Sequence, residues 1–133
     1  MMRKLDKRGV AALEFCLVAV PLFTLMFAIF DLGRYAITMQ SLRMLANAGA
    51  RAVMLTYDAT SNTYTGCTGD PLPSTAAKQA VAPFLYFGGY TPELAAGALT
   101  VRASSNFTML MTMIWGTAFN APSASTSIPF CSS

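Results

Sequence analysis

The sequence contains no histidine and unusually few charged residues. Only 11% of its 133 residues are charged, against about 25% in soluble globular proteins, whereas 54% are hydrophobic. The absence of histidine excludes His-based catalytic triads and His-ligated metal sites, and there is no Walker-type glycine-rich loop. We therefore expect no enzyme, no cofactor and no metal site. The low charge indicates a chain that lies partly in a membrane or in the interior of a polymer.

The net charge of +3 comes entirely from the first nine residues. Four basic residues oppose one acidic residue there, whereas five basic and five acidic residues balance from Val10 onwards. The sequence therefore predicts no extended basic surface, and we expect no nucleic-acid partner.

Three cysteines are present, and none are in C-x-x-C spacing. Cys16 lies in an apolar run, where a thiol behaves as a small hydrophobe. Cys67 and Cys131 lie in the Ser/Thr-rich remainder of the chain, which is exported if the apolar run is an outward-pointing anchor. An oxidising compartment then favours a Cys67–Cys131 disulfide; the alternative is two free thiols.

The apolar run Val10 to Phe30 is long enough to span a membrane. Its 21 residues cover about 31 Å as a helix, close to the thickness of a hydrocarbon core. Basic residues precede it and Asp31 follows it, which favours a single-pass, N-in and C-out orientation. A cleaved secretory signal is disfavoured, because the nearest A-x-A-like triplet is Ala46-Asn47-Ala48, well past the run. A lipoprotein is disfavoured because no small residues directly precede Cys16.

The helix is expected to continue beyond the membrane, from about Val10 to about Tyr57, with a possible kink at Pro21. Polar residues at 40, 43, 47 and 51 predict an exposed stripe. An apolar seam with spacings of three and four is formed by Leu32, Tyr35, Met39, Leu42, Ala46, Gly49 and Val53.

The remainder predicts a small domain with little helix. Residues 58–74 are typical of a loop, and Ser74 or Thr75 can cap a short helix from 76 to about 85. Apolar and polar residues alternate at 99–103, which predicts a half-buried strand. Residues 123–131 can form a returning strand, and Pro129 indicates that this strand lies at an edge of the sheet. The apolar, Met-rich segment 107–119 is either core or subunit interface, or a membrane-touching or adhesive loop.

Taken together, these patterns predict an α+β fold of four parts. A basic leader, 1–9, precedes the membrane half of the helix, 10–30. The amphipathic extension of the same helix, 31–57, then leads into a small extracytoplasmic domain, 58–133.

Glu14 is the one carboxylate inside the apolar run. A charge at the bilayer centre costs about 2.5–3.5 kcal/mol, although Glu14 lies near enough to the helix start to reach the headgroups. The alternative is a partner in another subunit. Cleavage after Gly9 would create an ammonium at Val10, and pairing with Glu14 of a displaced neighbour would fix the axial stagger of a filament. Such buried pairs set register better than they add stability.

The N-terminal block resembles TadE-like proteins, which are pseudopilins, or minor pilins, of the tight-adherence (Flp) pilus system. The residues that carry the resemblance are Arg8-Gly9-Val10-Ala11-Ala12-Leu13-Glu14-Phe15, then residues 17–23, then Phe30-Asp31-Leu32-Gly33-Arg34. The resemblance implies a type IV pilin-like fold and cleavage after Gly9 by a prepilin peptidase. It also implies a new N-terminus at Val10 and a role for Glu14 in processing or assembly.

The expected function is therefore structural, in pilus assembly and surface adhesion. The expected partners are other pilin and pseudopilin subunits, the prepilin peptidase, the inner-membrane assembly platform and membrane lipid. The expected location is the bacterial inner membrane, and then the extracellular pilus. The main alternative is a single-pass, membrane-anchored periplasmic protein that is neither cleaved nor polymerised. A small anchored enzyme finds no support in the residues.

Overall fold

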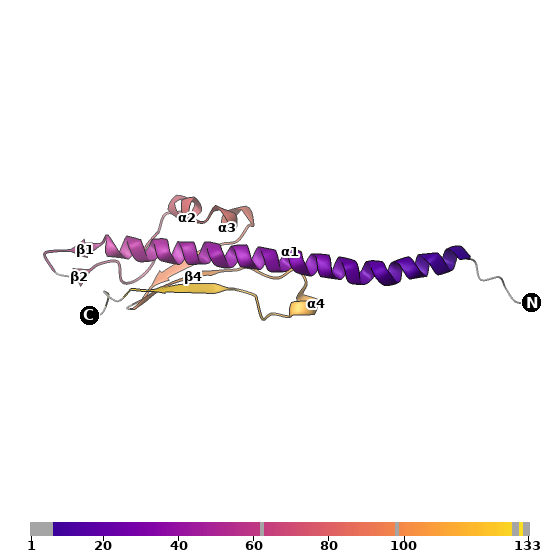
Figure 1. Cartoon of the computed structure of the whole chain (residues 1–133). Coiled ribbons are helices and arrows are strands. Elements are labelled where there is room, and N and C mark those ends of the chain that lie inside the picture. Colours follow the sequence, from indigo (N-terminus) through magenta and orange to yellow (C-terminus); the bar gives the residue numbers. More distant parts are fainter. Residues whose placement is uncertain (1–6, 62, 98, 129–130, 132–133) are drawn as a thin grey trace, which may run out of the picture.

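One long helix organises the whole chain. The computed structural model describes residues 7–61, 63–97, 99–128 and 131, so residues 1–6 of the predicted leader and Pro129 lie outside the described residues. Helix α1 (Lys7–Met54) has 48 residues and is about 72 Å long at 1.5 Å per residue. Figure 1 shows its N-terminal half projecting alone, while every other element gathers along its C-terminal half.

The predicted continuous helix from Val10 to about Tyr57 is confirmed, with shifted ends. The helix begins three residues earlier, at Lys7, and ends at Met54, so the last residues of the predicted leader are helical. Pro21 lies inside it and Figure 1 shows a gentle bend in this half. A proline removes one backbone donor and crowds the preceding turn, which is the usual cause of such a bend.

A three-stranded antiparallel sheet packs against the C-terminal half of α1. Its strands are β3 (Pro92–Ala96), β4 (Thr100–Ser105) and β5 (Ser123–Ser127), in the order β3-β4-β5. Strand β4 confirms the alternating pattern predicted at 99–103, and β5 confirms the returning edge strand. The residues with inward-facing side chains alternate along β4, which gives the sheet one face for the helix and one for solvent.

Strand β3 was not predicted from the sequence. Thr91-Pro92 is typical of a helix stop, and only Pro92 and Leu94 of this short strand are buried. The strand is stabilised by its antiparallel pairing with β4, in which Leu94 lies opposite Ala103 at the centre of the sheet. Proline is tolerated at position 92 because it is the first residue of an edge strand.

The core lies between α1 and the elements that wrap it. Figure 1 shows α2 and α3 on one side of α1 and the sheet on the other, and both groups contact the helix. The main cluster of buried apolar residues draws on every layer and consists of Leu42, Leu45, Ala46, Ala50, Val53, Ala82, Leu85, Leu94, Val101, Ala103, Ala124, Ile128 and Cys131.

The predicted seam is only partly correct. The C-terminal part of the seam is buried, but Leu32 at its N-terminal end is 40% exposed. Leu45, which does not belong to the predicted seam, is completely buried. The buried stripe is wider than a seam of threes and fours because two groups of elements contact α1 from different sides. The predicted polar stripe is exposed, as expected, at Gln40, Arg43, Asn47 and Arg51.

Gly49 marks the closest approach of the helix to the sheet. A Cβ atom at this position would lie 2.9 Å from Cδ2 of Leu94 and 3.0 Å from Cγ1 of Val101. Both distances are shorter than ordinary van der Waals contact. Glycine therefore lets β3 and β4 approach the helix backbone, which offsets its weak helix propensity.

Two short helices replace the single helix predicted from 76 to about 85. These are α2 (Thr75–Val81) and α3 (Pro83–Phe87). The break falls at Ala82, because a residue before proline is disfavoured in the α region and Pro83 is well suited to start a new helix. Ser74 occupies the N-cap position of α2, but its side chain makes no capping hydrogen bond.

The predicted loop 58–74 contains an unpredicted two-stranded hairpin. Strands β1 (Tyr57–Asp58) and β2 (Thr63–Tyr64) pair antiparallel. Asp58 accepts hydrogen bonds from the backbone N–H of Thr60, at 2.9 Å, and the hydroxyl of Ser61, at 2.8 Å. These bonds, first that of Thr60, lower the pKa of Asp58 because they favour the charged carboxylate.

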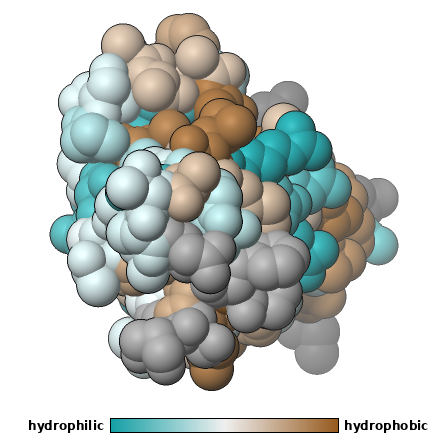
Figure 2. Space-filling view, turned by 90° about the vertical axis from the view of Figure 1, so that its left-hand side faces the viewer, coloured by the Kyte–Doolittle hydropathy of each residue, from teal (hydrophilic) through white to brown (hydrophobic). Residues whose placement is uncertain are grey.

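The resulting layout is the α+β, pilin-like arrangement expected from the sequence: a long apolar N-terminal helix that carries a small antiparallel sheet domain. Figure 2 looks onto the end of the molecule farthest from the N-terminus. Hydrophilic and weakly polar residues predominate there, around a smaller hydrophobic patch. The distal end of the domain is therefore suited to water, in contrast to the bare half of α1.

Candidate processing and assembly site

The Gly9–Val10 peptide bond lies in the first turn of α1. A Cβ atom added to Gly9 would meet nothing within 4 Å, and Val10 is 54% exposed. The first turn of a helix lacks intrahelical partners for its N–H groups, and this one contains no acidic residue that would stabilise it. The residues on both sides of this bond are therefore not covered by other parts of the described chain.

Glu14 lies one helical turn beyond Val10 on the same face. The offset of four residues corresponds to about 6 Å along the axis and about 40° around it. The ion pairs among the described side chains are Asp31–Arg34 and Asp70–Lys78, and neither involves Glu14. The Glu14 carboxylate is exposed and is thus available to a group outside the described chain.

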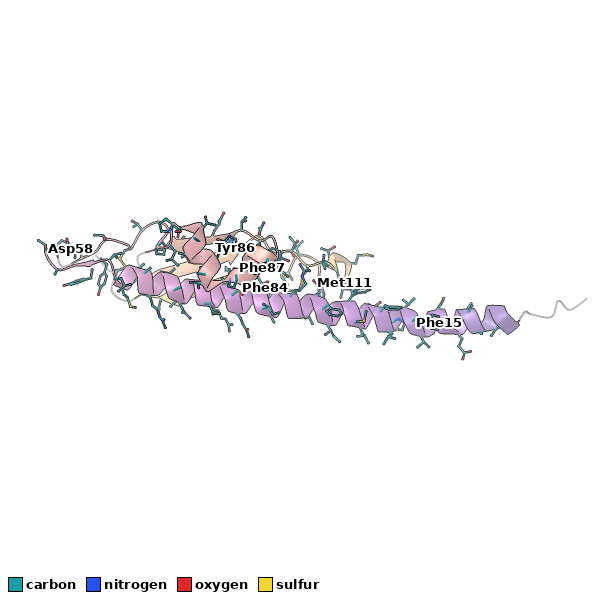
Figure 3. All side chains as sticks on the ribbon, turned by 90° about the horizontal axis from the view of Figure 1, so that it is seen from above. Phe15, Asp58, Phe84, Tyr86, Phe87 and Met111 are labelled. Atoms are coloured by element: carbon teal, nitrogen blue, oxygen red, sulfur yellow. A yellow bond between two sulfur atoms is a disulfide. The ribbon has the colours of Figure 1, made fainter. Side chains whose placement is uncertain are left out.

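The surface around these residues is almost entirely apolar. Helix α1 is the one helix of the described chain that is long and apolar enough to cross a membrane, and its most apolar window has a mean hydropathy of 2.3 with none of it buried. Phe15, which Figure 3 labels on the bare half of α1, is 72% exposed. Such a surface is unstable in water. The helix fits a membrane anchor, and its side chains need lipid or other helices around them.

Asp31 ends this apolar surface and is the most buried charged residue in the described chain. Its exposed fraction is 1%. Oδ1 accepts a hydrogen bond from the backbone N–H of Leu110, at 3.2 Å, and Oδ2 accepts one from Met111, at 3.0 Å. The Arg34 guanidinium is 3.4 Å from Oδ1, one turn further along α1. A buried carboxylate is tolerated only with such partners.

The segment that Asp31 holds is the apolar stretch 107–119. The guanidinium of Arg34 lies 5.4 Å from the ring centroid of Phe107 and donates a hydrogen bond to the Tyr90 hydroxyl. Tyr35 of α1 packs edge-on against Phe119, with ring centroids 5.2 Å apart. Both ends of the segment are therefore fixed to α1 by aromatic contacts.

The core prediction for this Met-rich segment is confirmed for part of it. Phe107 and Met109 are buried, as the core prediction requires. The middle contains a short helix, α4 (Thr112–Trp115), and apolar side chains in this helix and just before it face outward. The sequence pattern indicates Asp31 only as the charge that follows the apolar run, and its role as the anchor of this segment was not predicted. The i,i+3 spacing of Asp31 and Arg34 was the available signal.

The two cysteines of the predicted pair meet at the distal end of the domain. A disulfide joins Cys67 and Cys131, whose Cα atoms are 5.7 Å apart. It connects the loop after the β1–β2 hairpin to the chain after β5. Cys16 is a free, exposed thiol on the bare half of α1. The structure thus places Gly9, Val10 and Glu14 at one end of the molecule and the disulfide at the other.

Nothing in the described part of the chain forms a metal site, since it holds no cluster of three or more His, Cys, Asp and Glu side chains that could bind an ion. A shallow hollow of about 300 Å³ lies on the α2–α3 side, lined by Gln79, Pro83, Tyr86 and Phe87. Figure 3 shows Tyr86 and Phe87 on this side of α1. No catalytic arrangement accompanies the hollow.

The N-terminal part of the chain is similar to a known protein family. No curated protein and no solved structure matches the chain significantly. The sequence model of the TadE-like protein family matches residues 9–51, which begin at Gly9 and include Glu14, Asp31 and most of α1. TadE-like proteins are structural proteins associated with Tad pili. Residues 9–51 are therefore similar to TadE-like proteins, as the resemblance in the sequence indicated.

Proposed function

We propose that this chain is a pseudopilin, or minor pilin, of a Tad (Flp) pilus, processed after Gly9 by a prepilin peptidase and incorporated through α1. One observation carries the proposal. The N-terminal half of a 48-residue helix is apolar and bare and holds a single exposed carboxylate next to its start, while the other half is the core of a domain. The TadE-like family model matches both halves, over residues 9–51.

The processing step is a hydrolysis. Water adds across the Gly9–Val10 amide, so that Gly9 leaves with the leader as a carboxylate and Val10 becomes an ammonium. The leader also carries the excess positive charge of the chain, which favours retention on the cytoplasmic side. Removing it leaves a mature chain with balanced charges, which is easier to transfer out of the membrane into a filament.

Assembly would use the new ammonium and Glu14. In a bundle of apolar helices, a carboxylate and an ammonium are costly alone and tolerable as a pair. A pair between subunits displaced along the axis enforces stagger, as a helical filament requires. Because Glu14 and Val10 also share a face of one helix, a pair within the chain is the competing arrangement, and it would leave the stagger undefined.

The proposed location is the bacterial inner membrane, single-pass with the N-terminus inside and the domain outside. The charge asymmetry across residues 10–30 supports this orientation. So does the Cys67–Cys131 disulfide, because disulfides persist in oxidising compartments. Partners would be other pilin and pseudopilin subunits, the peptidase, the assembly platform and lipid, and the output would be pilus assembly and surface adhesion.

N-terminal sequencing of the membrane-extracted protein tests the proposal. Expressed with the peptidase, the mature chain should begin at Val10, and a Gly9→Val variant should keep its leader. A chain that keeps its leader in the presence of the active peptidase would contradict the proposal. It would favour instead an anchored periplasmic protein that is neither cleaved nor polymerised.

A further inference from the structure

The α4 segment presents apolar side chains to the outside of the domain. Met113 is fully exposed at 100%, Leu110 at 75% and Ile114 at 45%. They sit on a stretch, residues 106–122, that contains no charged residue. A cluster of this kind on a small domain calls for a partner surface.

The contacts with α1 fix where this cluster lies along the helix. The backbone N–H groups of Leu110 and Met111 bind the Asp31 carboxylate, and Trp115 packs edge-on against Phe119, 5.9 Å between centroids. Phe119 in turn packs against Tyr35. The cluster is therefore held beside the first turns of α1 that follow Phe30 and cannot swing away from them.

That position coincides with the end of the membrane-spanning run. Residues 10–30 cover about 31 Å, the thickness of a hydrocarbon core, so Asp31 lies at its outer boundary. Figure 1 shows α4 as the part of the domain nearest to the bare half of α1, and Figure 3 shows Met111 at the same edge. The apolar cluster is thus at the depth where headgroups meet acyl chains.

We propose that α4 and its flanks form a second membrane contact, in which Leu110, Met113 and Ile114 insert into the outer interface of the lipid bilayer beside α1. The inference rests on the membrane anchoring proposed above but not on cleavage or polymerisation. Short apolar segments with a tryptophan are suited to this depth. Since the segment carries no charge, a zwitterionic lipid is a sufficient ligand.

Continuity of the surface favours lipid over a protein partner. The exposed side chains of Phe27 and Phe30, at 52% and 64%, occupy the turns of α1 just before Asp31, and the α4 cluster extends the same apolar surface sideways. The Asp31 carboxylate is shielded from lipid because both of its oxygens are already bonded. The domain would therefore rest on the membrane instead of standing away from it.

Trp115 is the only tryptophan of the chain and reports on this contact directly. The full-length protein is reconstituted at high dilution in phosphatidylcholine vesicles containing lipid brominated near the headgroup end of the acyl chains. We expect bromolipid to quench Trp115 emission roughly twofold, as for a tryptophan at a membrane interface. The Met113→Asp and Leu110→Asp/Met113→Asp variants should lose most of this quenching.

Leu55→Asp is the matched control. Leu55 is 87% exposed but lies just beyond the distal end of α1, so its variant should be quenched like the wild type. Vesicle flotation separates the two proposals: a chain that fails to float overturns both the anchor and this contact. A chain that floats without bromolipid quenching overturns the contact alone. Trp115 emission that is unquenched at high dilution and changes only at a high protein-to-lipid ratio would assign the cluster to a neighbouring subunit and also overturn the lipid contact.

Discussion

The backbone N–H of Met111 donates a hydrogen bond to Oδ2 of Asp31 over 3.0 Å, across 80 residues of sequence. With the bond from Leu110 to Oδ1, it makes one side chain of α1 the fixing point of the α4 segment. Replacing Asp31 by Asn presents an NH₂ group to one of these N–H donors. Because the site is 1% exposed, an unmatched donor there should lower the free energy of unfolding by about 1–3 kcal/mol.

Thermal and urea unfolding of the full chain in detergent measure this effect. Glu93→Gln is the control, since Glu93 is an exposed carboxylate on β3 and its loss should leave stability unchanged. Equal stability of the Asp31→Asn variant and the wild type would show that the two backbone bonds contribute nothing net.

Glu14→Ala should abolish pilus output while leaving membrane insertion intact. The side chain is exposed on the bare half of α1, so its removal costs no folding energy, and an alanine eases insertion. Filament yield after shearing and subunit content of the membrane fraction give the two readouts. Glu14→Asp, which keeps the charge, should restore part of the yield. Normal piliation by Glu14→Ala would contradict the proposed pairing with Val10.

Gly49→Ala should destabilise the domain by about 1–3 kcal/mol, the usual range for overpacking. The new Cβ would lie 2.9 Å from Leu94 and 3.0 Å from Val101, so the sheet must move away from α1. Gly33→Ala is a matched substitution in the same helix, where a Cβ meets nothing within 4 Å. That variant should be neutral or stabilised by up to about 1 kcal/mol through helix propensity. Unfolding midpoints that rank the two variants in the opposite order would refute this account of the interface.

Reduction of the Cys67–Cys131 bond should lower stability by about 4 kcal/mol, the loop-entropy value for cysteines 64 residues apart. Urea unfolding with and without reductant measures the loss. The Cys67→Ser/Cys131→Ser variant should match the reduced wild type, whereas Cys16→Ser should behave like the oxidised protein. If reductant leaves the free energy of unfolding unchanged, the reduced unfolded chain must already be as constrained as the disulfide-linked one, which would contradict this prediction.

The β1–β2 hairpin should loosen in acid. The pKa of Asp58 is lowered in the folded chain, chiefly by the N–H of Thr60, so this contribution to stability is complete above the unfolded pKa and is lost as pH falls through the folded value. In an NMR titration, the Thr60 amide resonance should move with the Asp58 carboxyl resonance. Asp58→Asn should remove the coupled titration. A Thr60 amide that does not respond would contradict the hydrogen bond.

Periodicity made the long-range layout predictable. Helix α1 and strand β4 each repeat one pattern over several residues, and that pattern reflects burial on one face. Strand β3 was not predicted because only two of its residues, Pro92 and Leu94, are buried, which is too few to form a recognisable pattern. The break between α2 and α3 is caused by Pro83, which disfavours a helical conformation at Ala82. The helical pattern over residues 76–85 gave no sign of this break.

The candidate site divides in the same way. Gly9, Val10 and Glu14 are close in sequence, so their arrangement on one helix could be predicted from spacing alone. The bonds to Asp31 could not, because its partners are backbone N–H groups, which every residue except proline possesses. Which of them reach a carboxylate 79 and 80 residues away is decided by the path of the chain after β4.

The unbroken course of α1 has a mechanical consequence. The same helix is anchor and domain core, so there is no linker between the two, and a force applied to the N-terminal half reaches the sheet through the backbone hydrogen bonds of one element. A filament built from such subunits would be loaded along its helices, and its domains would follow the rotation of the helices as rigid attachments.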